Sequence, residues 1–258
     1  MKRFAFLAAA PLARAVAACM TASEPAADTS TSYAAAVAAP GRPAEAIALD
    51  ASRKPAEVLQ WLGIKRGMDV ADLISGTGYW AEIMAHIVGP EGSVTAYEPS
   101  QFYNDEKGAA LWSGIAARTP TVMLVRYPFE AFAPPARSLD AAIINMSYHD
   151  LYWQSEQYKI PRTDPDAWAR ALYAAMRPGG VVGVIDHVGL AGDTRTTVDK
   201  LHRIDPAVVR ADFERAGFRF AGSSELLANP ADDHTKLVFD PSVRGKTDRF
   251  MMKFVKPR

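Results

Sequence analysis

The chain has 258 residues, of which 49% are apolar, and its 29 basic side chains balance its 29 acidic ones. This length and apolar content support one domain with a substantial core. A formal net charge of zero gives no basis for binding nucleic acid, which needs a basic surface. A single cysteine, Cys19, excludes a disulfide within the chain.

The first residues have the pattern of an export signal. Two basic residues precede an apolar run over residues 4–13, which is too short to cross a membrane as a helix. The sequence Val-Ala-Ala-Cys that ends at Cys19 resembles the lipobox of bacterial lipoproteins, in which the cysteine is lipidated and becomes the mature N-terminus. The Ala-Val-Ala at 15–17 is an alternative site of ordinary signal cleavage. We therefore expect a signal in residues 1–19 and an exported, periplasmic protein held at the membrane by lipid on Cys19.

The next segment, residues 20–46, is rich in Ala, Ser, Thr and Pro and has no sustained apolar period. Such a composition is typical of a flexible tether. We expect the folded domain to occupy residues 47–258, with a first helix opened by Pro55.

A strand, a glycine turn, a helix and a second strand then follow one another. The apolar run 70–74 enters the turn Ser-Gly-Thr-Gly, and the helical apolar pattern after it ends before Gly89. The second strand, 93–97, ends in Glu98, about 20 residues past the glycines, where nucleotide-binding βαβ units carry a carboxylate for ribose hydroxyls. We expect the turn to contact a nucleotide-type cofactor and Glu98 to bind its sugar.

Two cofactors fit this unit. The run Gly76-x-Gly78-x-x-Ala81 matches a dinucleotide fingerprint, which makes an NAD(P)-dependent oxidoreductase one interpretation. Asp72 lies inside the first strand, four residues before the first glycine, and is not part of that fingerprint, whose turn must sit near a pyrophosphate. A cationic sulfonium cofactor tolerates an acid there.

The same stretch resembles the first motif of class I S-adenosylmethionine (SAM) dependent methyltransferases, which reads acid-x-Gly-x-Gly-x-Gly. Ile74 stands where the family has its first glycine, and a β-branched side chain resists the unusual φ and ψ that glycine permits. The resemblance implies SAM as the cofactor, bound through Asp72, Ile74, Ser75, Gly76 and Gly78.

The remaining elements predict the same fold. We expect helices over 105–117, 165–176 and 206–217 and strands over 121–125, 139–144, 181–185, 218–226 and 250–255. A loop rather than a crossover helix joins the last two strands, which predicts an antiparallel hairpin closing a mostly parallel sheet, whereas nicotinamide domains carry a parallel sixth strand. The expected architecture is therefore α/β: a Rossmann-like, seven-stranded class I methyltransferase fold with helices on both faces.

The acid that commonly receives the adenine amino group after the third strand in this family is missing. The chain reads Arg-Tyr-Pro-Phe at 126–129, so adenine would be held by backbone groups and by stacking on Tyr127 or Phe129, unless these rings belong to the core. The phrases NMSYHDLYW, LHRIDP and FDPSVRGKTDRF resemble those of a bacterial group of predicted exported methyltransferases. That resemblance implies a reaction class and no particular acceptor.

Polar residues gather after the fourth and fifth strands. Parallel sheets bind ligands beyond the carboxyl ends of their strands, so we expect Asp72, Glu98, Asn145 and Asp186 to converge on one crevice, with Asn145 on the cofactor side. The candidate base for an acceptor that carries a proton is His149, and further candidate catalytic residues are Tyr148, Asp150 and Asp186.

Metal binding is not expected. Asp150, Asp186 and His187 are ligand types for a divalent cation, but no close-spaced ligand motif supports a site. His86 and His202 are interpreted as surface or packing residues.

Our first interpretation is an exported, lipid-anchored SAM-dependent methyltransferase acting on a small-molecule acceptor. The second is an exported binding protein that keeps a degenerate methyltransferase fold without catalysis, and the third is an NAD(P)-dependent oxidoreductase. The oligomeric state does not follow from the sequence.

Overall fold

The computed structural model describes Met1 and residues 29–258. The export signal and the lipidation of Cys19 therefore fall outside the described residues and stay predictions. Within residues 29–258, no helix is both long enough and apolar enough to cross a membrane.

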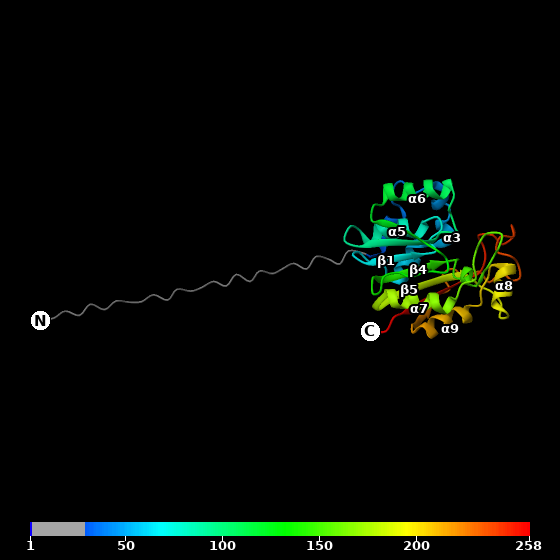
Figure 1. The fold of residues 1–258 in the computed structure, drawn as a ribbon. Coiled ribbons are helices and arrows are strands. Elements are labelled where there is room, and N and C mark those ends of the chain that lie inside the picture. The colour runs from blue at the N-terminus through cyan, green and yellow to red at the C-terminus, as the bar shows by residue number, and fades with distance from the viewer. Residues whose placement is uncertain (2–28) are drawn as a thin grey trace.

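A seven-stranded sheet forms the centre of the domain (Figure 1). Its strands are β1 (Asp69–Leu73), β2 (Ser93–Pro99), β3 (Val122–Tyr127), β4 (Leu139–Asn145), β5 (Met176–His187), β6 (Arg219–Ser223) and β7 (Arg249–Val255). Their order is β3-β2-β1-β4-β5-β7-β6; the first five are parallel, and β7 runs antiparallel to both neighbours. The expected fold, including the C-terminal antiparallel hairpin, is confirmed.

Helices cover both faces of this sheet (Figure 1). They are α1 (Thr29–Val37), α2 (Ala44–Ile47), α3 (Asp50–Arg53), α4 (Pro55–Leu62), α5 (Tyr79–Val88), α6 (Glu106–Arg118), α7 (Pro165–Ala175), α8 (Thr194–Leu201) and α9 (Pro206–Ala216), with a 3₁₀ turn, η1 (His149–Tyr152). One apolar core packs α1, α4, α5 and α6 against one face, and a second packs α7 and α9 against the other.

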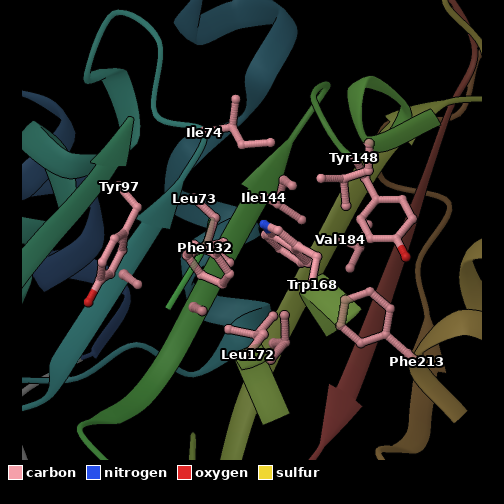
Figure 2. Close-up of a cluster of buried hydrophobic side chains, with 14 of the residues drawn as sticks. Leu73, Ile74, Tyr97, Phe132, Ile144, Tyr148, Trp168, Leu172, Val184 and Phe213 are labelled. Carbon is pink, nitrogen blue, oxygen red and sulfur yellow. The ribbon is translucent and has the colours of Figure 1, made fainter. Parts of the chain in front are cut away.

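The second core is rich in aromatic rings (Figure 2). Phe213 of α9 stacks on Phe254 of β7 with ring centroids 4.4 Å apart, and Phe132 stacks on Trp168 of α7 at 4.8 Å. Burying each such side chain stabilises the fold by about 1.5–3 kcal/mol. This packing holds α7 against β5, whose end carries polar residues, and α9 against β6 and β7.

Local sequence signals explain where α7 and α9 begin. Asp164 accepts backbone N–H bonds from the first turn of α7, Asp205 does the same for α9, and a proline occupies the first position of each helix. Gly217 ends α9 in the left-handed conformation, with φ of 105°. These starts and stops match the prediction.

The segment assigned to a flexible tether is partly folded. Helix α1 lies within this segment and α2 extends one residue beyond it. Tyr33 and Ala36 of α1 are buried in the first core. The Tyr33 hydroxyl donates to the Ile64 carbonyl at 2.6 Å. The sequence-based domain boundary at residue 47 is therefore wrong, because alanine-rich composition resembles a linker although small side chains pack well between helices.

Candidate functional site

The strands β1, β2, β4 and β5 end at the same edge of the sheet. Leu73 pairs with Tyr97 on one side and with Ile144 on the other, and Asn145 pairs with Ile185. The chain order reverses between β1 and β4, and open parallel sheets bind ligands at such a reversal. The residues just past these positions, Glu98, Asn145 and Asp186, therefore lie along one edge, as expected.

Asp72 organises the glycine turn from within. Its carboxylate is 1% exposed and accepts hydrogen bonds from the Ser75 hydroxyl at 2.5 Å and from the Ala81 backbone N–H at 3.0 Å. Burial raises the pKa of Asp72 to about 7, against the lowering effect of these hydrogen bonds and of Arg53. Asp72 and Ser75 thus bind each other and the start of α5, and they shape the turn instead of presenting free groups to a ligand.

The turn requires positive φ at three positions. Ile74, Gly76 and Gly78 have φ of 51°, 58° and 71°. Glycine adopts these values without strain, whereas a β-branched residue is a clear outlier there. A Cβ on Gly78 would lie 2.4 Å from the Ile115 side chain, so that glycine is also required for packing.

Glu98 has the geometry of a ribose-binding carboxylate. It is fully buried, and its Oε2 accepts the Gly76 backbone N–H at 2.6 Å. Its Oε1 is buried and makes no hydrogen bond within the described residues. Burial raises the pKa of Glu98 to about 7, with Arg126 opposing and Asp150 adding to the shift.

A second buried acceptor lies at the same edge. The Asn145 side-chain oxygen is also buried without a partner in the described part of the chain. Unpaired buried acceptors destabilise a fold by about 1–3 kcal/mol each, so two of them at a ligand-binding edge need an explanation. Hydroxyl or amine donors of a nucleoside would satisfy both, and these residues therefore fit SAM.

Tyr103 lies against the glycine turn, and sequence reasoning missed it. Its ring is the nearest group to a Cβ built on Gly76, at 3.4 Å, and the side chain is 47% exposed. Arg126 donates to the carbonyls of Phe102 and Tyr103, both at 2.6 Å, and so fixes the loop after β2. Tyr103 is therefore an aromatic side chain beside the glycine turn, on the same side as Gly76.

Three aromatic side chains among the candidate site residues lie in the core. Tyr127 and Phe129, expected to stack on adenine, are 7% and 1% exposed and belong to the second core. Tyr148, expected in the catalytic site, is fully buried and donates its hydroxyl to Asp212 of α9 at 2.8 Å (Figure 2 shows its ring turned toward Phe213). Their rings fill space under the sheet edge, which the apolar pattern alone did not reveal.

His149 is held by Asp186. Its Nδ1 lies 2.8 Å from Asp186 Oδ1, and its backbone N–H donates to Asp186 Oδ2 at 2.9 Å. Burial by itself lowers the pKa of His149, but the carboxylates of Asp186 and Asp150 outweigh it and raise the pKa to about 9. The pKa of Asp150 is also raised, to about 6, because burial outweighs the lowering effect of His149.

His202 completes the cluster from a distant segment. It ends α8 with φ of 50°, and its Nδ1 lies 3.4 Å from His149 Nε2. The interpretation of His202 as only a surface or packing residue therefore misses its neighbour. No local signal could have found it, because residues 149 and 202 meet only through the packing of α8 beside η1.

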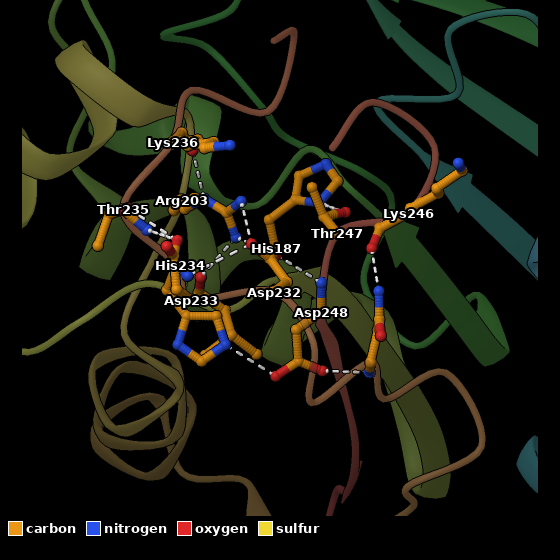
Figure 3. Close-up of polar contacts among 12 residues, drawn as sticks. His187, Arg203, Asp232, Asp233, His234, Thr235, Lys236, Lys246, Thr247 and Asp248 are labelled. Carbon is orange, nitrogen blue, oxygen red and sulfur yellow. Dashed lines mark hydrogen bonds and ion pairs between the residues drawn. The ribbon is translucent and has the colours of Figure 1, made fainter. Parts of the chain in front are cut away.

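The long loop between β6 and β7 is fastened to this edge (Figure 3). The fully buried Arg203 pairs with Asp232 at 2.8 Å and donates to the carbonyl of Lys236. His187 points toward Thr247, with its Nδ1 2.7 Å from the hydroxyl oxygen, and its ring centroid lies 6.0 Å from that of His149. The network fixes α8 and, with it, the position of His202.

A hollow of about 610 Å³ lies beside residues 154–162, directly after Trp153, whose ring packs on His202. Its lining includes neither of the buried unpaired acceptors, Glu98 Oε1 and Asn145 Oδ1. These acceptors therefore favour the strand edge over this hollow as the cofactor site.

A comparison with known protein families matches the part of the chain that carries the cofactor side of this edge. The family model of protein-L-isoaspartate (D-aspartate) O-methyltransferase matches residues 35–106, which include the glycine turn and Glu98. No curated protein sequence matches the chain.

Several solved structures share the fold. A SAM-dependent methyltransferase from Aquifex aeolicus has a TM-score of 0.55 at 18% identity, over 78% of this chain and 88% of that one. A SAM-dependent methyltransferase from Mesorhizobium loti has 0.55 at 14%, over 80% and 99%. The [4+2]-cyclase SpnF has 0.57 at 17%, over 89% and 93%. At these identities the likeness shows the fold, which is that of class I SAM-dependent methyltransferases, and the family-model match over residues 35–106 covers the glycine turn and Glu98.

Proposed function

We propose that this protein transfers the methyl group of SAM to a small-molecule acceptor, outside the cytosol, from a domain anchored by lipid on Cys19. The observation that supports cofactor binding most directly is the buried, unpaired Oε1 of Glu98 beside the Gly76 backbone. Ribose hydroxyls would donate to it in charge-assisted hydrogen bonds, which are stronger than neutral ones.

Each residue of the edge has a role in this proposal. Glu98 binds the ribose, Asn145 accepts a further hydrogen bond from the cofactor, and Asp72 keeps the turn in shape. SAM, when bound, supplies an electrophilic methyl group. The chain's own contribution is then to orient an acceptor and to take up its proton.

The proton-accepting side of the strand edge is the cluster of His149, Asp150 and Asp186. Because the pKa of His149 is about 9 and only the neutral ring accepts a proton, turnover should rise with pH up to about 9. Asp186 fixes the His149 ring through Nδ1, which leaves Nε2 facing Asp150 Oδ1 at 3.5 Å. The Asp150 side chain is 16% exposed, so an acceptor can reach it. His149→Ala should lower turnover by about 10²- to 10⁴-fold while leaving SAM affinity nearly unchanged.

The family model does not identify the methyl acceptor. Its match ends at residue 106, before the loop that holds His149, so the protein-carboxyl chemistry in that family's name does not extend to the acceptor side of this chain. The zero net charge supports a small molecule over nucleic acid.

A noncatalytic binding protein is the alternative. The strained Ile74, with φ of 51°, and the burial of Tyr127 and Phe129 leave the adenine side without its usual acid or a stacking ring from β3. The antiparallel β7 argues against an NAD(P)-dependent oxidoreductase, because nicotinamide-binding domains carry a parallel strand at this position.

Titration of the protein with SAM, S-adenosylhomocysteine and NAD⁺ in a calorimeter separates these functions. Binding of SAM and its product, with no heat from NAD⁺, is the expected result. Tight SAM binding without methyl transfer to a broad panel of small-molecule acceptors would favour the binding protein, and binding of NAD⁺ alone would overturn the proposal.

The localisation is tested separately. Stable anchoring takes two or more acyl chains, so the unmutated protein should fractionate with membranes, and Cys19→Ala should change its retention there. Recovery of the unmutated protein in soluble form, cleaved after Ala17 or uncleaved, would refute the anchor.

A further inference from the structure

We propose that His149, Asp150 and His202 form a binding site for one divalent transition-metal ion at the acceptor side of the crevice. One ligand atom from each residue can be chosen so that all three lie within 4.8 Å of one another. Two imidazole nitrogens and a carboxylate oxygen are the ligand set of many zinc sites with an open position.

Two of the three separations between the ligand atoms fit an ion better than direct hydrogen bonds. His149 Nε2 lies 3.4 Å from His202 Nδ1 and 3.5 Å from Asp150 Oδ1. Charge-assisted hydrogen bonds are shorter, at about 2.7–2.9 Å. Ligand atoms held about 2.0–2.1 Å from a tetrahedral Zn²⁺ lie about 3.3 Å apart, which is close to both observed separations.

Asp186 orients the first ligand in the way that metal-binding histidines require. It accepts from His149 Nδ1, and its carboxylate is itself fixed by the backbone N–H groups of His149, at 2.9 Å, and His187, at 2.7 Å. With the proton held on Nδ1, the lone pair of Nε2 is directed at the other two ligands.

His202 is held equally firmly. Its ring packs between Trp153 and Phe239, with centroids 5.2 and 5.1 Å away, and the neighbouring Arg203 is tied to Asp232 (Figure 3). A preorganised ring loses little freedom when it binds an ion. Because Asp150 is partly exposed, a fourth position stays open to water or to an acceptor atom.

The proposal revises the set of ligands considered from the sequence. In the structure Asp186 orients His149 instead of binding the ion, and His187 faces Thr247. His202 replaces these two residues in the proposed ligand set. An ion here would lower the pKa of an acceptor hydroxyl or thiol bound at the open position; this consequence rests on the proposed methyl transfer, whereas the binding of the ion does not.

Equilibrium dialysis of the chelator-stripped full chain against Zn²⁺, and titration with Co²⁺ followed by visible absorption, test the site. We expect one ion per chain and a tetrahedral cobalt spectrum. Asp150→Asn and His202→Asn should each weaken binding at least about tenfold, and Asp186→Asn by about 10–100-fold. Asparagine tolerates the positive φ of His202, so this variant should keep the fold, as circular dichroism can verify.

His86→Asn is the matched control, because His86 is an exposed histidine of α5. Equal losses in His86→Asn and His202→Asn, no stoichiometric binding, or a thiolate-to-cobalt band from Cys19 would each overturn the proposal. Titration of the stripped protein with SAM is a separate measurement, so a failed metal site would leave the proposed cofactor binding standing, and the reverse also holds.

Discussion

Glu98→Ala should weaken SAM binding by about 1.5–3 kcal/mol, which is roughly a 10- to 150-fold loss of affinity. The structure gives the reason. Oε2 already holds the Gly76 N–H at 2.6 Å, while the buried Oε1 has no partner among the described residues. Truncation therefore removes the acceptor for the ribose and also releases the backbone of the turn.

The same carboxylate should make SAM affinity depend on pH. Burial raises the pKa of Glu98 to about 7, so the ionised fraction rises from about 0.1 at pH 6 to about 0.9 at pH 8. Hydroxyl donors favour the ionised form, so binding lowers this pKa and affinity increases with pH. We expect SAM to bind about tenfold more tightly at pH 8 than at pH 6.

Calorimetric titration at pH 6, 7 and 8 measures both effects. Glu98→Gln keeps an acceptor but cannot ionise, so its affinity should be lower than that of the unmutated protein at pH 8 and nearly independent of pH. Glu91→Ala is the matched control, since Glu91 lies on the surface in an exposed ion pair with Arg66. Equal affinity of the unmutated protein and Glu98→Ala would remove Glu98 from the site, and an unchanged pH slope in Glu98→Gln would assign the titration to another group.

Three further predictions concern stability, measured by urea unfolding. Because Ile74 has φ of 51°, Ile74→Gly should be more stable than Ile74→Ala by about 1–2 kcal/mol, which reverses the usual order of these residues. Asp72 has a pKa of about 7 in the folded protein, against an ordinary value of 3.8 for an aspartate, so the folded state holds more protons between these values and Asp72 lowers the free energy of unfolding by roughly 4 kcal/mol as pH rises. Asp72→Asn should remove this contribution to the pH slope, while those of Glu98 and Asp150 stay. Tyr148→Phe should destabilise by about 1–3 kcal/mol through the loss of its bond to buried Asp212, with SAM affinity unchanged.

Each of these has a contradicting outcome. Greater stability of Ile74→Ala than Ile74→Gly would show that the backbone strain is small. An unaltered pH slope in Asp72→Asn would mean that Asp72 ionises normally in the folded protein. A large loss of SAM affinity in Tyr148→Phe would return this ring to the binding site.

The sequence by itself determined the strand–turn–helix unit, the starts of α7 and α9 and the position of Glu98. These features depend on local chemistry: glycines for positive φ, Asp-Pro pairs at helix starts, and an acid at the end of the second strand. The antiparallel β7 was also predictable, since no helix separates it from β6 to allow a parallel crossover.

Only the tertiary structure decided which rings and charges lie at the site edge of the sheet. Tyr127, Phe129 and Tyr148 follow strand ends like true site residues, yet they point into the core, because the side of the sheet edge on which a ring lies depends on packing with α7 and α9. His202 reaches His149 across more than fifty residues, through a helix held by the Arg203 pair. Contacts of this kind come from the assembled layers, and no spacing along the chain encodes them.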